Sequence, residues 1–385
     1  MDFTHGMSLD VSMGLSVLNP ELSAEIKHGK PIKNSINQNS SNSQPNLPIV
    51  FLSNIQSFGR SGNKDKSSEI DEILNLNAVD IAVFTETWLC KNTVDHLPFS
   101  NYVKFHFIRE NVLRPSGGIS VFTRNDLPAT RLKVKVPNNL ECIWVSIRPR
   151  WLPRNVSNII VCGVYYPGSS SKYAPPQEDL ILYLIEVIHK LVRKYSNPLF
   201  LIMGDFNDLD VTDICETCSL VQVVKSPTRN DSKLDLILTN KTNTYYKIPV
   251  TLPQIGDSDH LCVLYEPNKY VKPKFKKKKK EMRMFKKSAR LEFGSWITHF
   301  DWSEQFSLDD PTEKVEYLSK TVWDKINEIF PIVKVVASDT DKEWMTVEIK
   351  NNIAQRQMAH LENNIDFRNH LAKKLRSQIR EVRRL

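Results

Sequence analysis

Several apolar runs of this chain lead into polar residues whose chemistry suits phosphate-ester hydrolysis. The candidates at the ends of these runs are Asn54, Glu86, Tyr165, Asp205, Asn207, Asp235, Asp259 and His260. Taken singly, such residues are more commonly turn formers, helix caps or solvent-exposed groups. Together, they place carboxylates, amides, a phenol and an imidazole at the ends of six apolar runs. This combination favours one site at the edge of a sheet, where open α/β sheets bind ligands.

The residue types match what phosphodiester hydrolysis requires. The reaction needs a hard cation such as Mg²⁺ at the phosphoryl oxygens, a carboxylate to deprotonate water, and donors to the developing charge. In the stretch "FLIMGDFND", residues two apart in an extended chain point to the same side. Asp205 and Asn207 are therefore expected to face one phosphate together. Gly204 before them gives the backbone room to turn into the site.

The apolar runs themselves predict strands that are buried on both faces. They are rich in Val, Ile, Leu and Phe, as in "IVFLS", "NIIVCGVYY" and "LDLILTN". Two stretches between the runs, residues 67–76 and 177–195, carry apolar residues at helical spacing. Strands that alternate with helices predict an α/β domain.

Changes in composition divide the 385-residue chain into four parts. Residues 1–46 are polar and rich in Asn and Ser, which predicts a disordered leader. The α/β domain is expected over residues 47–267, followed by a lysine-rich linker over 268–290 and a helical, basic extension over 291–385. The extension is expected to pack through Trp296, Trp302, Tyr317, Leu318, Val322, Trp323 and Ile326, and to end in a long basic helix or helical pair.

The net charge of +8 is concentrated in two segments. Residues 269–290 hold twelve Lys or Arg against one acidic residue, and residues 367–385 hold seven against one. Such a run is either a solvated linker or a contact for a polyanion.

Other features of the sequence bear on location. No run is long and apolar enough to span a bilayer, and no basic residue precedes Lys27, which argues against a secretory signal. The six scattered cysteines are interpreted as reduced intracellular thiols. With the basic segments, these features favour an intracellular, nuclear location and no membrane partner.

The motifs resemble those of the exonuclease–endonuclease–phosphatase superfamily, which includes apurinic endonucleases and DNase-I-like enzymes. The matching pieces, in order, are "SNIQSF", "FTETWL", "GGISVF", "VYYPGS", "GDFND", "LDLIL" and "SDH". Singly these pieces are modest, but their joint order and spacing are specific. The resemblance covers residues 48–266 and implies a two-sheet α/β sandwich, DNase-I-like, with the site at one edge.

The resemblance also implies how charge is handled at the site. Glu86 would be the principal Mg²⁺ ligand, with Mn²⁺ as an alternative ion, and Asp259 would assist the metal or the substrate. His260 would stabilise the pentacovalent phosphorus, with Asp235 orienting its imidazole. Some relatives carry a carboxylate where this chain has Gln56, which leaves a thinner metal shell and the number of metal ions open.

The remaining roles concern the attacking water and the phosphate. Asp205 would activate the water, and Asn54 and Asn207 would position water and phosphate. Tyr165 would donate to the phosphate or to the leaving oxygen.

A narrower resemblance is to the apurinic-type endonuclease domains of non-LTR (LINE-like) retrotransposons. It is carried by "FTETWL", "VYYPG" and "SPTR" followed by "LDLILTN", and by a tail similar to the segment before the reverse transcriptase of those polyproteins. It implies a Mg²⁺-dependent nick in DNA that leaves a 3′-hydroxyl and a 5′-phosphate. The lysine run would hold nucleic acid through Lys276, Lys277, Lys278, Lys279 and Lys280.

Two alternatives stay open at this point. One is another phosphodiesterase or phosphatase of the superfamily, acting on lipid, inositol phosphate or RNA. The other is a catalytically silent remnant that serves as an interaction protein. The target sequence and the oligomeric state are not specified by the sequence.

Overall fold

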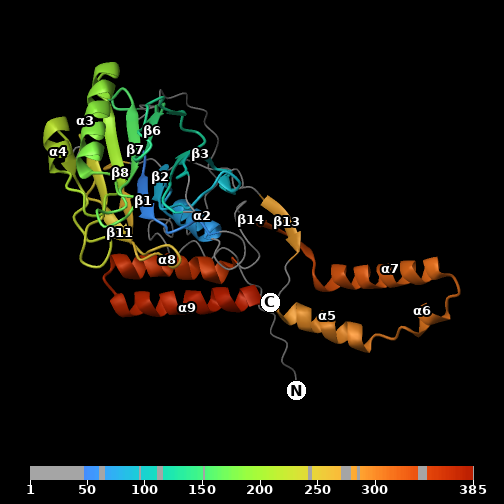
Figure 1. Cartoon of the computed structure of the whole chain (residues 1–385). Helices are drawn as coiled ribbons and strands as arrows, with labels where there is room; N and C mark the ends of the chain where they lie inside the picture. The colour runs from blue at the N-terminus through green and yellow to red at the C-terminus, as the bar shows by residue number, and fades with distance from the viewer. Residues whose placement is uncertain are drawn as a thin grey trace, which may run out of the picture. The chain divides into compact units, whose positions relative to one another are not determined.

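Two six-stranded sheets pack face to face in this computed structural model (Figure 1). The structure describes residues 47–59, 66–94, 97–110, 116–150, 152–241, 245–269, 279–283, 287–336 and 345–384. In spatial order, the first sheet contains β11 (Val250–Leu252), β12 (Cys262–Tyr265), β1 (Val50–Asn54), β2 (Ile81–Thr85), β4 (Ile119–Arg124) and β3 (Tyr102–Phe107). The second sheet contains β5 (Ala129–Arg131), β6 (Glu141–Ile147), β7 (Ile159–Tyr165), β8 (Leu199–Asp205), β10 (Asp235–Thr239) and β9 (Val221–Gln222). This arrangement confirms the predicted two-sheet α/β sandwich.

Alternating side chains of the central strands build three apolar layers. In β1, Leu52 joins the core between the sheets, whereas its neighbour Phe51 faces the opposite side. In β8, Leu201 points into the same central core and Ile202 points outward. Because both faces of these strands are buried, they read in the sequence as continuous apolar runs.

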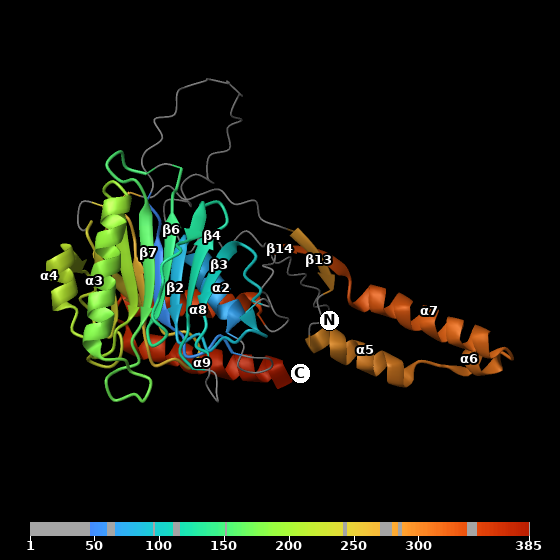
Figure 2. The same cartoon turned by 45° about the horizontal axis from the view of Figure 1, so that its top comes forward.

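Two helices cover the outer faces of the sheets, as the periodicity predicted. Helix α2 (Ser67–Leu76) packs on the first sheet through Ile70 and Leu74. Helix α3 (Gln177–Lys194) packs on the second sheet through residues such as Leu184 (Figure 2). The short helix α4 (Thr212–Cys218) follows β8.

Strand register brings the polar strand ends to one edge of the sandwich. Parallel pairing of β7 with β8 places Tyr165 beside Asp205, and antiparallel pairing of β10 with β8 places Asp235 on the other side of Asp205. In the first sheet, parallel pairing of β1 with β2 places Asn54 beside Thr85, the residue that precedes Glu86. The backbone hydrogen bonds between paired strands thus fix the relative positions of these residues, independently of side-chain contacts.

The end of the chain forms the predicted helical pair, but this pair is part of the globular domain. Helices α8 (Val347–Leu361) and α9 (Ile365–Arg384) pack on each other, and α8 lies against α2 and β11. Ile349 and Ile353 join the apolar layer outside the first sheet. The buried Arg356 forms an ion pair with Glu69 of α2 at 3.2 Å.

Part of the predicted linker is ordered. Strand β13 (Lys279–Arg283) pairs antiparallel with β14 (Ile332–Val336), and α5 (Lys287–His299) begins before the expected boundary at residue 291. The linker prediction was wrong there because the apolar "IVKVV" of β14 offers the lysine-rich segment a partner strand.

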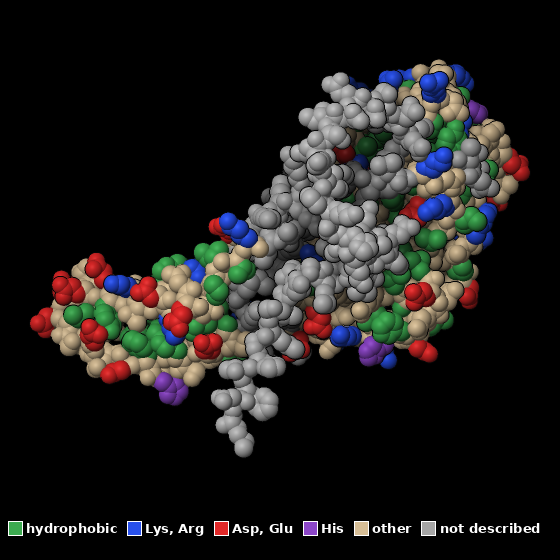
Figure 3. Space-filling view, turned by 180° about the vertical axis from the view of Figure 1, so that it is seen from behind, with side chains coloured by type: hydrophobic (Ala, Val, Ile, Leu, Met, Phe, Trp, Pro, Cys, Tyr) green, Lys and Arg blue, Asp and Glu red, His purple; other side chains and the backbone are tan. Residues whose placement is uncertain are grey.

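Between these strands, α5, α6 (Ser303–Ser307) and α7 (Pro311–Ile329) form a helical hairpin whose described side chains are mostly exposed. Trp296 packs against Phe293 and Trp302, as expected. Leu318 and Trp323 were also predicted to pack, but their exposed fractions are 37% and 57%. Figure 3 shows hydrophobic side chains at the surface of this hairpin.

The predicted leader, residues 1–46, lies outside the described residues. Within the part of the chain that the structure describes, no helix is both long and apolar enough to cross a membrane.

Replacement of Gly204 tests the close approach of β7 and β8. A Cβ atom at Gly204 would overlap the backbone of Val164, so we expect Gly204→Ala to lower the free energy of unfolding by about 2 kcal/mol or more. Gly294, in α5, has nothing within 4 Å of its added Cβ and serves as the matched control. Gly294→Ala should be neutral or stabilise by up to about 1 kcal/mol. Urea unfolding of both variants measures the contrast, and equal effects would contradict it.

Candidate active site

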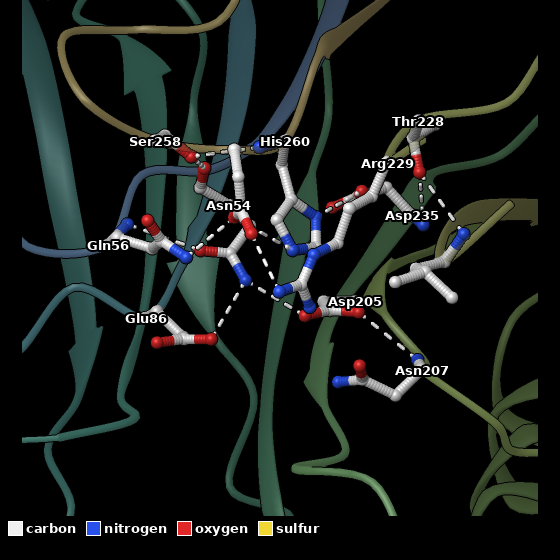
Figure 4. A network of polar contacts seen from close by, with 12 residues as sticks. Asn54, Gln56, Glu86, Asp205, Asn207, Thr228, Arg229, Asp235, Ser258 and His260 are labelled. Carbon is white, nitrogen blue, oxygen red and sulfur yellow. Dashed lines mark hydrogen bonds and ion pairs between the residues drawn. The ribbon is translucent and has the colours of Figure 1, made fainter. Parts of the chain in front are cut away.

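Asn54 links the two sheets at the edge where the strands end. Its Nδ2 donates to Glu86 Oε1 at 3.0 Å and to Asp205 Oδ2 at 2.8 Å (Figure 4). Asn54 and Asp205 are buried, and Glu86 is half-buried. One amide therefore holds a carboxylate from each sheet, and the two carboxylates lie on either side of a single nitrogen atom.

Asp205, Asp235 and His260 form a buried cluster beside this amide. Their ligand atoms all lie within 4.8 Å of one another, and His260 Nδ1 donates to Asp235 Oδ2 at 2.7 Å. Burial and the charge of Asp235 raise the pKa of Asp205 to about 8, against the opposing effects of His260 and Asn54. Burial alone would lower the pKa of His260, but its hydrogen bond to Asp235 and the surrounding carboxylates raise it overall.

The turn after β2 holds Glu86 in an unusual backbone conformation. Glu86 and Trp88 both have positive φ angles, 50° and 52°, which non-glycine residues rarely adopt. The turn is fixed because Trp88 N donates to Gly117 O and Thr87 N to Gly118 O. Trp88 Nε1 also donates to Glu86 Oε2 at 3.2 Å. This strained turn aims the Glu86 carboxylate at the edge of the sheets.

Tyr165 lies beside the partly buried guanidinium of Arg109. The guanidinium of Arg109 is 5.6 Å from the centre of the Tyr165 ring, and it forms an ion pair with Glu141. Burial, together with the charges of Glu86 and Asp205, raises the pKa of Tyr165 far above its usual range. Its phenol therefore stays protonated and is available as a hydrogen-bond donor.

Asn207 lies at the site, but in an orientation that differs from the predicted one. Strand β8 ends at Asp205, and Asn207 has a φ of 47°, so the two residues do not face one side of an extended chain. Instead, Asn207 N donates to Asp205 Oδ1 at 3.1 Å, and its Nδ2 donates to Tyr166 O at 2.7 Å. Asn207 thus closes a tight turn around the Asp205 carboxylate.

Asp259 lies at the exposed rim of the site, next to His260. Its Oδ1 accepts from Gln56 Nε2 at 2.7 Å, and its Oδ2 is 2.6 Å from Arg229 Nη2. His260 Nε2 is 3.8 Å from Asp259 Oδ1. Both carboxylate oxygens of Asp259 therefore already have protein partners.

Comparison with known proteins is decisive at the level of the family. The model of the Endonuclease/Exonuclease/phosphatase family matches residues 52–260, which is more than half of the chain. The chain belongs to this family. The name covers hydrolases that act on phosphodiester or phosphate bonds. No curated protein matches the chain.

Solved structures resemble the chain at low sequence identity. The endonuclease domain of TRAS1, a telomere-specific non-LTR retrotransposon, is 14% identical; the match covers 58% of this chain and 100% of that domain, with a TM-score of 0.41. A family protein from Leptotrichia buccalis gives 12% identity, the same coverages and a TM-score of 0.41. D. rerio TDP2, complexed with single-strand DNA product, gives 11% identity, coverages of 58% and 99%, and a TM-score of 0.43.

Enzymes of this family generally use divalent metals, and the site fits one. Its buried Asp235 Oδ1 has no hydrogen-bond partner among the described residues, and the buried carboxylate of Asp205 is only partly compensated by His260, Asn54 and the Asn207 backbone. Glu86 adds a third oxygen donor on the same edge. Hard cations such as Mg²⁺ prefer oxygen ligands of this kind. We assign the imidazole of His260 to its hydrogen bond with Asp235 and not to a metal.

The predicted nucleic-acid contacts in the lysine run stay a prediction. Lys276, Lys277 and Lys278 lie outside the described residues. Lys279 and Lys280 belong to β13, but of these two residues only the backbone is described.

Several residues that shape the site were not anticipated from the sequence, namely Trp88, Arg109, Glu141, Thr228 and Arg229. They lie in turns or loops, or begin a strand, and no apolar run leads into them. "SPTR" was noted as a motif, but it gave Arg229 no role. A cation or indole in a loop has no periodic signal that separates it from an ordinary surface residue.

The raised pKa of Asp205 predicts a pH-dependent stability. An unfolded Asp205 would lose its proton near pH 3.8, whereas the folded one keeps it up to about pH 8. The free energy of unfolding should therefore fall as pH rises between these values, and the raised pKa of His260 acts in the same direction. In EDTA, we expect Tm to fall more between about pH 5 and about pH 8 in the wild type than in Asp205→Asn. If Tm falls equally or more in Asp205→Asn than in the wild type, the pH dependence does not arise from Asp205.

Proposed function

We propose that this protein is a divalent-metal-dependent DNA endonuclease, derived from a non-LTR retrotransposon and acting in the nucleus. It would hydrolyse one phosphodiester bond and leave a 3′-hydroxyl and a 5′-phosphate. The observation that carries the proposal is the buried carboxylate of Asp205, held by Asn54 and surrounded by Glu86, Asp235 and His260. No stabilising role accounts for two carboxylates on one amide with a third, Asp235, beside Asp205, because buried like charges destabilise a fold.

The residues divide the reaction between a base and a set of donors. In its ionised form, which the raised pKa makes a stronger base, Asp205 accepts a proton from the attacking water, and the Asn54 amide orients its carboxylate. His260 carries a proton on the nitrogen facing Asp235 and, with its raised pKa, favours the cationic form that stabilises negative charge on phosphorus. The protonated phenol of Tyr165 donates to the phosphate or to the departing 3′-oxygen.

Glu86, whose carboxylate shares the Asn54 amide with Asp205, would hold a Mg²⁺ or Mn²⁺ ion. When bound, such an ion would neutralise charge on the phosphoryl oxygens. The positive φ of Glu86 keeps its carboxylate at the edge before any ligand binds, which limits reorganisation during the reaction.

The charge distribution supports a nucleic acid over a small phosphate ester. Lys373, Arg376 and Arg380 are exposed on α9, and the lysine run adds to them along the chain. Polyanions bind such surfaces through counterion release, which predicts weak sequence discrimination.

Substitution of Asp205 tests the catalytic assignment. We expect Asp205→Ala to lower the rate of plasmid nicking in Mg²⁺ by about 10²–10⁴-fold, because a general base and a buried charge are lost together. Asp213→Ala removes an exposed carboxylate of α4 and should nick at the wild-type rate. EDTA should abolish nicking by the wild type. Unchanged nicking by Asp205→Ala would show that another residue is the base.

A substrate panel tests the choice of DNA. Intact, abasic and single-stranded DNA are compared with RNA and with a phosphoinositide under the same conditions, and DNA nicking should weaken steeply as salt is raised. Preferential hydrolysis of the phosphoinositide or RNA would favour another phosphodiesterase of the family. Absence of hydrolysis across the panel would favour a catalytically silent protein.

A further inference from the structure

Arg229 lies at the rim of the site on a hydrogen-bonded turn. It begins a tight turn in which Arg229 N donates to Ser232 O at 3.1 Å, and Ser232 N donates back to Arg229 O at 2.9 Å. Asn230 completes the turn with a positive φ of 48°. The position of the Arg229 backbone is therefore set by hydrogen bonds within its own turn.

The preceding residue, Thr228, fastens this turn to the catalytic cluster. Thr228 is fully buried, and its Oγ1 accepts from Leu234 N and Asp235 N, both at 3.1 Å. Its carbonyl oxygen accepts from Leu261 N at 2.7 Å. Thr228 thus contacts the backbone of Asp235 and that of the residue after His260, so Arg229 is placed relative to both.

The Arg229 side chain is held at the rim by Asp259. The pair is separated by 2.6 Å, yet the Arg229 and Asp259 side chains are 40% and 46% exposed. Exposed ion pairs contribute little to stability, so stability does not explain why this one closes over the site. Only Nη2 of Arg229 is paired with Asp259, so other N–H groups of the guanidinium do not contact this carboxylate. Guanidinium groups suit the bidentate recognition of phosphate.

Gln56 makes the binding of a second metal ion by Asp259 at this rim less favourable. Gln56 is fixed because its N donates to Asn54 Oδ1 at 3.2 Å, and its side chain donates to the same carboxylate that pairs with Arg229. An amide and a guanidinium therefore occupy both oxygens of Asp259. A second divalent cation at this rim would have to displace them, and Gln56 offers it no charge.

We propose that Arg229 binds a backbone phosphate of the nucleic-acid substrate at this rim, where it supplies the positive charge that a second cation would otherwise supply. Asp259 and Gln56 are positioning residues for it and not metal ligands. The inference rests on the proposed nuclease function and deepens it by naming the residue that contacts substrate outside the cluster of Asp205, Asp235 and His260.

Binding of a short fluorescent DNA duplex in EDTA tests the contact without cleavage. We expect Arg229→Ala to bind about tenfold more weakly at low salt and to reduce the salt slope of log Kd by about 0.9, the value for one lost phosphate contact. Arg229→Lys should recover most of the slope. The control is Arg193→Ala. Arg193 is an exposed arginine in the last turn of α3, and the chain continues from this helix into the start of β8, whose other end carries Asp205. Equal slopes for Arg229→Ala and Arg193→Ala, or failure of the wild type to bind, would overturn the contact.

Asp259→Asn tests the positioning role by the sign of its effect. Removal of a negative charge alone should strengthen DNA binding, because it reduces repulsion of phosphate. Loss of positioning should instead weaken it, and Asp259→Asn should have no such weakening effect in the Arg229→Ala background. Tighter binding by Asp259→Asn with Arg229 present would overturn the role of Asp259. Wild-type DNA binding without nicking would refute the proposed function and leave this contact standing.

Discussion

A carboxylate has been placed where water is largely excluded, and the rest of the site is arranged around that constraint. Asp205 is buried at the end of β8, and its charged form is disfavoured by burial and by Asp235. Such a group destabilises the fold unless something nearby compensates it. Asn54, the backbone of Asn207 and the imidazole of His260 provide that compensation in part. The part of the Asp205 charge that these groups do not compensate would be neutralised by a bound cation.

The sandwich supplies the precision that this arrangement needs. Residues from both sheets meet at Asn54, while Asp205 is flanked by Tyr165 and Asp235 through strand pairing alone. Sites built on paired strands keep their geometry better than sites built on loops. The loops then add what the strands lack, namely the strained turn of Glu86 and the hairpin that carries Arg229.

The sequence predicted much of this because buried strands and amphipathic helices leave local patterns. The strands before Asp205 and Glu86 and the helix over 177–194 followed from apolar runs and 3.6-residue spacing. The predicted orientation of Asn207 was wrong because β8 ends at Asp205, two residues before Asn207, whose φ is positive. The docking of α8 was missed because Arg356 and Glu69, 287 positions apart, leave no signal in either local stretch. Family motifs indicated the cluster, but they said nothing of Arg109 or of Arg229.

The docked α8 also has a consequence for how the domain is delimited. Ile349 and Ile353 cover apolar surface outside the first sheet, and Arg356 neutralises the buried Glu69. A fragment cut after residue 267 would keep every proposed catalytic side chain. It would expose that apolar surface and leave Glu69 without the ion pair to Arg356. The folded unit is therefore larger than residues 52–260, which match the family, because α8 and α9 contribute Ile349, Ile353 and Leu375 to the apolar layer outside the first sheet.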